Sequence, residues 1–129
     1  MLLNPSTADE RDDDATLRRC IGFARAGGFG AVAIANLFAL RARDPRQLLR
    51  SRDPVGRAND RAILAIARRS EAIVLGWGAW GERFPARAGH VRLLLAPFSR
   101  RVFVLEWTRK GEPRHPLYLS GRARFTRAR

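Results

Sequence analysis

Four short segments of the sequence carry side chains that could bind or transform a ligand: Asn4-Pro5-Ser6-Thr7, Asn36, Gly76-Trp77-Gly78 and His115. Asparagine amides can read a base edge, and histidine can donate to a developing negative charge. Glycine allows close approach of the backbone, and tryptophan can stack on a base. The first three segments also have a structural explanation: a strand-exit turn for the first, a strand cap for Asn36 and a tryptophan packed over a sheet edge for the third.

Each of these segments follows an apolar run that is typical of a strand. The runs are Leu2-Leu3 and residues 31–35, 72–75 and 101–105, the last reaching His115 through a polar connection. Unbroken apolar runs indicate strands that are buried on both faces. Because parallel strands end at the same edge of a sheet, we expect the four segments to meet at one rim.

Amphipathic helices are predicted between these strands. Leu17, Cys20, Ile21 and Ala24 recur at helical spacing before Gly27-Gly28, and this indicates one buried stripe and a helix end. Further helices are predicted over residues 58–69 and 88–98, with a helical turn and loop over residues 46–53. The alternation predicts an α/β fold, a three-layer α/β/α sandwich around a central, mostly parallel four-stranded sheet.

Acidic residues gather before the first predicted helix, where Asp12, Asp13 and Asp14 stand in a row. Asp13 or Asp14 is a suitable N-cap, and negative charge there favours the helix dipole. The alternative is a metal-dependent nuclease built on Asp9, Asp12 and Asp13. Adjacent carboxylates point in different directions, so we expect capping and no bound metal.

The charge balance points toward an anionic partner. The chain has 129 residues, with 25 lysines and arginines against 12 acids and a formal net charge of +13. A basic body attracts polyanions, so nucleic acid or a nucleotide is the expected partner, although arginine-rich composition alone could produce this balance. We expect a cytoplasmic protein with no membrane segment and no identified protein partner. The single Cys20 excludes an internal disulfide, and we expect no cofactor.

The length fits one domain. We expect residues 1–120 to form a single α/β domain and residues 121–129 to form a basic, mobile tail that carries four arginines.

Several motifs together resemble an uncharacterised bacterial and archaeal family, domain of unknown function 1643, over nearly the whole chain. The motifs are Leu3-Asn4-Pro5-Ser6-Thr7-Ala8-Asp9, Arg18-Arg19-Cys20, Asn36-Leu37-Phe38-Ala39, Asp53-Pro54-Val55-Gly56, Asn59-Asp60, Trp77-Gly78 and His115-Pro116-Leu117-Tyr118-Leu119. The resemblance implies residues before the Asn-Pro-Ser-Thr loop, so we expect that this chain begins late, inside its first strand.

The order of motifs is also similar to that of the uracil-DNA glycosylase superfamily. Asn4-Pro5 resembles the loop of its first strand, Asn36 its base-reading asparagine, Leu75-Gly76-Trp77-Gly78 its third-strand turn and His115-Pro116-Leu117 its final loop. This resemblance implies a glycosylase-like fold and excision of a flipped base. Asn4 would orient the attacking water, Asn36 would read the base and His115 would stabilise the departing base.

These observations define one candidate site. Asn4 and His115 are the predicted catalytic residues, and the predicted substrate-binding residues are Pro5, Ser6, Thr7, Asn36, Arg41, Arg43, Trp77, Gly78 and Tyr118. The predicted function is binding of nucleic acid or a nucleotide with hydrolysis of an N-glycosidic bond. The alternative is a non-catalytic nucleic-acid-binding module on the same scaffold.

Overall fold

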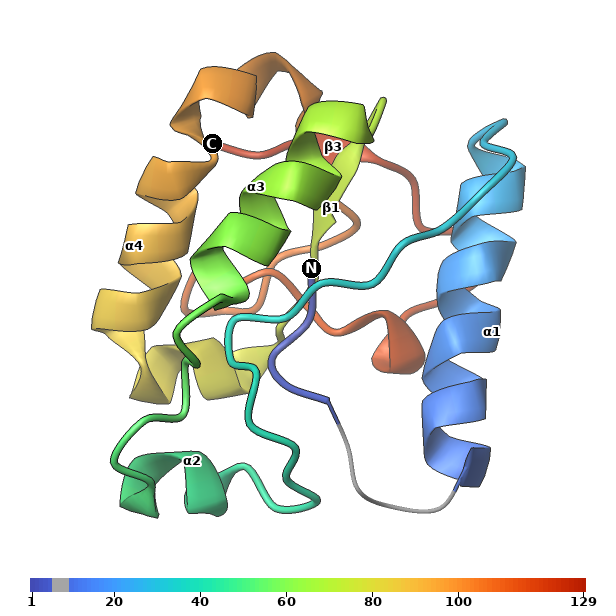
Figure 1. Ribbon diagram of the computed structural model, residues 1–129. Coiled ribbons are helices and arrows are strands. Elements are labelled where there is room, and N and C mark those ends of the chain that lie inside the picture. Colours follow the sequence, from blue (N-terminus) through green and yellow to red (C-terminus); the bar gives the residue numbers. More distant parts are fainter. Residues whose placement is uncertain (6–9) are drawn as a thin grey trace.

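The computed structural model describes the backbone of residues 1–5 and 10–129, and the side chains of residues 1–5 and 15–129 (Figure 1). In chain order, the elements are α1 (Glu10–Ala26), α2 (Arg46–Arg50), α3 (Asn59–Arg69), β1 (Ile73–Leu75), η1 (Ala79–Arg83), α4 (Pro85–Leu94), η2 (Ala96–Arg101), β2 (Val102–Val104), η3 (Pro116–Tyr118) and β3 (Thr126–Arg127). The four α elements are α-helices, and the three η elements are short 3₁₀ helices.

The sheet has three strands in the order β1-β2-β3. β1 and β2 are parallel, with Ile73 opposite Val102, and β3 runs antiparallel to β2. The prediction of a central, mostly parallel four-stranded sheet is therefore wrong, and with it the glycosylase-like sandwich. Two predicted strands, 72–75 and 101–105, are confirmed in slightly shorter form, whereas the other two form no strand.

The first predicted strand is replaced by a short extended segment, Met1–Leu3, beside β1. The Met1 ammonium donates to Val74 O over 2.7 Å, and Gly76 N–H donates to Met1 O. On the other side, a single parallel bridge joins Leu2 to Asn36. A ladder needs consecutive pairs, and Pro5, which has no amide proton, follows closely. These residues therefore pair without extending the sheet.

The second predicted strand, residues 31–35, is wrong for a different reason. Ala31, Val32 and Ala33 are exposed, although their apolar character predicted burial on both faces. Beside them lies a cavity of about 380 Å³, which also borders α1 and the residues just before β1. Apolar composition does not by itself supply the neighbouring strand that a ladder requires.

Helices cover both faces of the sheet. Ile73 and Leu75 face the main core, which Ile63 of α3 and Val91 of α4 complete. Val74 points the opposite way and packs against the smaller cluster that includes Phe23 of α1. Strand side chains alternate between faces, so the two clusters lie on opposite sides, with α1 standing apart from α3 and α4 (Figure 1).

The helix predictions were more accurate than the strand predictions. The predicted helix over residues 58–69 is confirmed as α3. The predicted helix over 88–98 begins earlier, because Pro85 suits a first helical position, and ends as α4 at Leu94 before η2. α1 begins at Glu10, so Asp13 and Asp14 lie within the helix and the N-cap prediction is wrong. None of the helices in the described residues combines the length and apolar character needed to cross a membrane.

The C-terminal residues contribute to the sheet. We expected residues 121–129 to be a mobile tail, and the structure places Thr126 and Arg127 in β3, opposite Val104 and Phe103. Ala128 N–H also donates to Val102 O over 3.0 Å.

One loop of the fold depends on a glycine. Gly56 has φ +84°, and a Cβ there would lie 2.8 Å from Ala39 Cβ. Gly111 has the same φ of +84°, with nothing within 4 Å of an added Cβ. We expect Gly111→Ala to lower the free energy of unfolding by about 1 kcal/mol through backbone strain alone. Gly56→Ala should cost about 2 kcal/mol more, because the methyl groups overlap. Urea denaturation measures both, and equal losses would contradict the proposed contact.

Candidate functional site

The Asn4–Pro5 turn is fixed by the backbone of a second loop. Asn4 Nδ2 donates to Pro5 O and to Ala42 O, each over 2.8 Å. Ala42 N–H donates to Pro5 O over 3.0 Å, and Ala42 is buried. Both amide hydrogens of Asn4 are therefore used within the protein, and Oδ1 accepts no hydrogen bond from the described residues. Ser6 and Thr7, which we also predicted to bind substrate, lie outside the described residues.

Arg41 and Arg43 flank this contact. Both are exposed, whereas Ala42 between them is buried. Within the described part of the chain neither arginine has an ion-pair partner. The hydrogen bonds to the Ala42 backbone therefore hold the loop that carries these two exposed arginines beside the Asn4–Pro5 turn.

Asn36 belongs to the adjacent segment, where its backbone bridges Leu2. Its carbonyl oxygen accepts from Asn59 Nδ2 over 3.1 Å. Its side-chain Oδ1 is buried with no hydrogen-bond partner among the described residues. This atom is thus shielded from a base edge in the present conformation.

Trp77 is part of the core. Its side chain is 1 % exposed, and Nε1 donates to Glu112 Oε2 over 2.6 Å. Arg92 lies over the ring, with its guanidinium carbon 5.3 Å from the ring centroid, and pairs with the same carboxylate. Gly81 permits this packing, because a Cβ there would overlap the indole. Trp77 is therefore a packed core residue, and its ring offers no face to a base.

His115 lies against the glycine that follows this tryptophan. Gly78 has φ +77°, and a Cβ there would lie 3.2 Å from His115 Cβ. His115 Nδ1 accepts from Leu117 N–H over 3.3 Å, so the neutral ring carries its proton on Nε2. Burial, helped by the nearby Met1 ammonium, lowers the pKa of His115 below its usual value. The side chain is therefore a neutral donor near pH 7.

The last predicted residue, Tyr118, follows on the same turn. Its side chain is 73 % exposed, and its ring centroid lies 5.7 Å from that of His115. Leu119, next in the chain, is buried.

The predicted residues thus fall into two groups. Asn4 and Pro5 are bonded to the loop that carries Arg41 and Arg43, while Gly78, His115 and Tyr118 form a second group. The backbone joins the groups through Met1, which bonds to Gly76. Among the described interactions, none links the Asn4 amide directly to the His115 ring. The nuclease alternative on Asp9, Asp12 and Asp13 lies outside the described side chains.

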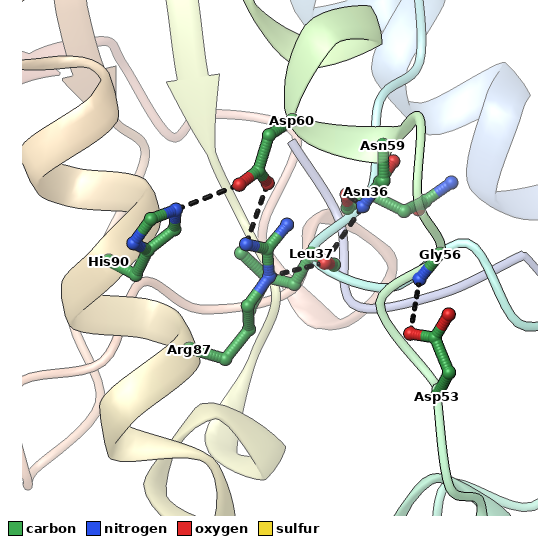
Figure 2. A network of polar contacts seen from close by, with 8 residues as sticks. All are labelled: Asn36, Leu37, Asp53, Gly56, Asn59, Asp60, Arg87 and His90. Atoms are coloured by element: carbon green, nitrogen blue, oxygen red, sulfur yellow. Dashed lines mark hydrogen bonds and ion pairs between the residues drawn. The ribbon is translucent and has the colours of Figure 1, made fainter.

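A cluster that sequence reasoning missed joins α3 to α4 (Figure 2). Asp60 Oδ2 lies 2.8 Å from His90 Nε2, and Asp60 Oδ1 lies 2.7 Å from Arg87 Nη1 in an ion pair outside hydrogen-bond geometry. Arg87 Nε donates to Leu37 O over 2.7 Å, and Asn59 Nδ2 donates to the same oxygen over 3.0 Å. Arg87 and His90 are three residues apart on one face of α4. This spacing is the sequence feature from which the cluster could have been predicted.

The cluster anchors the Asn36–Leu37 segment rather than exposing a reactive group. The Arg87 side chain is only 9 % exposed. Partial burial would raise the pKa of Asp60, but the close ion pair with Arg87 and the hydrogen bond and charge of His90 outweigh burial and lower that pKa. The carboxylate is therefore ionised at neutral pH and fixes a buried guanidinium.

A family comparison matches residues 1–117 to the model described as "Protein of unknown function (DUF1643)". The match covers most of the chain, so the chain belongs to this family, as its motifs predicted. No significant match is found among curated proteins or among solved structures. The likeness to uracil-DNA glycosylases is not supported by these comparisons.

We expect Asp60→Asn to lower the free energy of unfolding by about 2 kcal/mol at pH 7, between values typical of exposed and buried ion pairs. Because the pKa of Asp60 is lowered by folding, this stabilisation is present above the unfolded pKa of about 3.9 and is lost as the pH falls through the folded pKa. The difference between the two proteins should therefore shrink below about pH 4. Denaturation at several pH values measures it.

Glu71→Gln is the matched control for this experiment, because Glu71 is an exposed acid with no ion pair among the described residues. The control should leave stability within about 0.5 kcal/mol of the parent. If Glu71→Gln lowers the free energy of unfolding as much as Asp60→Asn does, the loss of a negative charge, and not the loss of the cluster, explains the effect.

Proposed function

We propose that the chain is a nucleic-acid-binding protein and that Arg41 and Arg43, beside the Asn4–Pro5 turn, contact the phosphates. The observation that carries this proposal is the pair of hydrogen bonds to the Ala42 backbone, which anchors the loop between two exposed arginines. Exposed guanidinium groups on an anchored loop suit phosphate oxygens, which they can bind in a bidentate manner.

The overall charge supports the same function. The formal net charge is +13, and the arginines of the described ion pairs are few: Arg46, Arg87, Arg92 and Arg114. Excess positive charge attracts polyanions and gives binding that weakens steeply as salt rises. The surface Arg41–Ala42–Arg43 would give this general attraction a defined location.

The double variant Arg41→Gln/Arg43→Gln tests the location. We expect its affinity for a labelled single-stranded oligonucleotide to fall about tenfold, and the slope of log K against log salt to become shallower by about 1.4 for two lost phosphate contacts. Fluorescence anisotropy over a salt series gives both values.

Arg68→Gln/Arg69→Gln is the matched control, because it removes the same charge from an exposed pair at the end of α3. It should change affinity and slope clearly less. Equal effects of the two double variants would show charge without a defined site, and no binding by the parent protein at low salt would refute the proposed function.

A second candidate function is hydrolysis of an N-glycosidic bond, and the neutral Nε2–H of His115 is the observation that favours it. In this reaction the bond between base and sugar breaks, and the base leaves with the electron pair. The imidazole N–H would stabilise that negative charge. A water held by Asn4 Oδ1 would add to the sugar and supply the proton that the base finally carries.

Release of free base from oligonucleotides that contain deaminated or mismatched bases tests this reaction. If the reaction occurs, His115→Gln should lower its rate by about a hundredfold, as for loss of one stabilising donor, and Asn4→Ala should also lower it. Circular dichroism must show that both variants are folded. Binding of these oligonucleotides without release of any base would leave only the binding function.

A further inference from the structure

We propose that the turn from His115 to Tyr118 binds one unpaired nucleobase, with the Tyr118 ring as the stacking surface and His115 Nε2–H as the donor to a base carbonyl. This inference rests on the proposed nucleic-acid binding. It assigns a site to the base, whereas Arg41 and Arg43 would contact the phosphates.

The first support is the contrast between the aromatic side chains near this edge. Trp77 is 1 % exposed and Tyr118 is 73 % exposed. Stacking needs an accessible ring face, and it contributes to single-strand binding regardless of base identity. Of these two rings, only Tyr118 can meet that requirement.

The second support is that the exposed ring stands on a fixed turn. Pro116 and Leu119 are buried, and a Cβ at Gly76 would lie 3.0 Å from Pro116 Cδ. Arg19 of α1 donates to the carbonyl oxygens of Pro116 and Leu119. Tyr118 N–H bonds to His115 O over 3.2 Å. A ring on an anchored turn loses little backbone freedom when a base stacks on it.

The third support is the donor beside the ring. His115 Nδ1 is occupied by the Leu117 amide, so the ring proton is on Nε2. The two ring centroids are 5.7 Å apart. A base that stacks on Tyr118 would therefore have a neutral N–H donor close to its edge, and base carbonyls accept such bonds.

Tyr118 is the single tyrosine of the chain, so its ring signals in an NMR spectrum of protein with labelled tyrosine need no further assignment. We expect thymidine 5′-monophosphate and an oligothymidylate to shift these signals upfield through the ring current of the base. Ribose 5-phosphate, which has no base, should leave them unchanged. Unmoved signals while the oligothymidylate is bound would overturn the inference.

Affinity measurements give the second test. Tyr118→Ala should weaken binding of the oligothymidylate about tenfold, with the salt slope unchanged, whereas Tyr118→Phe should keep the parent affinity. Leu93→Ala is the matched control, since Leu93 is 75 % exposed on α4. His115→Ala should weaken binding of thymidine 5′-monophosphate and leave the weaker binding of ribose 5-phosphate unchanged.

The outcomes separate the two proposals. If Tyr118→Ala behaves like Leu93→Ala while the arginine double variant weakens binding, the base site is wrong and the nucleic-acid function stands. If the parent protein binds no oligonucleotide at low salt, both are wrong.

Discussion

The hydrogen bonds of Met1–Leu3 are the constraint on which the rest of the structure depends. This segment bonds to Val74 and Gly76 on one side and to Ala35, Leu37 and Phe38 on the other. It therefore joins the loop after residue 35 to the strand pair β1–β2, although it adds no strand to the sheet. Leu37 and Phe38 are almost fully buried, so the same contacts that align the backbone also close the core.

The positions of the candidate groups follow from this alignment. Asn4 follows the Met1–Leu3 segment at a point where its amide can donate to Ala42 O. Trp77 follows β1 at a point where its indole N–H can donate to Glu112. An unpaired buried N–H is costly, and the Glu112 carboxylate accepts a hydrogen bond from the indole. The ring can therefore be buried without that cost. His115 lies against Gly78, and the turn from His115 to Tyr118 leaves the Tyr118 ring exposed. One edge thus holds both a buried aromatic anchor and an exposed aromatic ring.

The sequence allowed the amphipathic helices and the two parallel strands to be predicted, because their signals are local. Helical spacing identified α3, and short apolar runs identified β1 and β2. Residues 31–35 gave a similar apolar signal and form no strand, since a ladder depends on a partner segment that composition does not specify. Trp77 and Tyr118 both looked like ligand-binding aromatics. Their difference in exposure arises from distant contacts, with Glu112 for the first and with α1 for the second.

The same distinction between anchored and exposed groups decides what the edge can do. Asn4, Asn59 and Arg87 donate to backbone carbonyls, and Arg87 also pairs with Asp60. These side chains therefore hold the loops in place and offer few groups to a ligand. Arg41, Arg43 and Tyr118, by contrast, are exposed. Guanidinium groups recognise phosphate and an aromatic ring recognises a base, and a single nucleic-acid strand presents both. Under the proposed function, this complementarity would favour a single strand over a duplex, in which the bases are already stacked and paired.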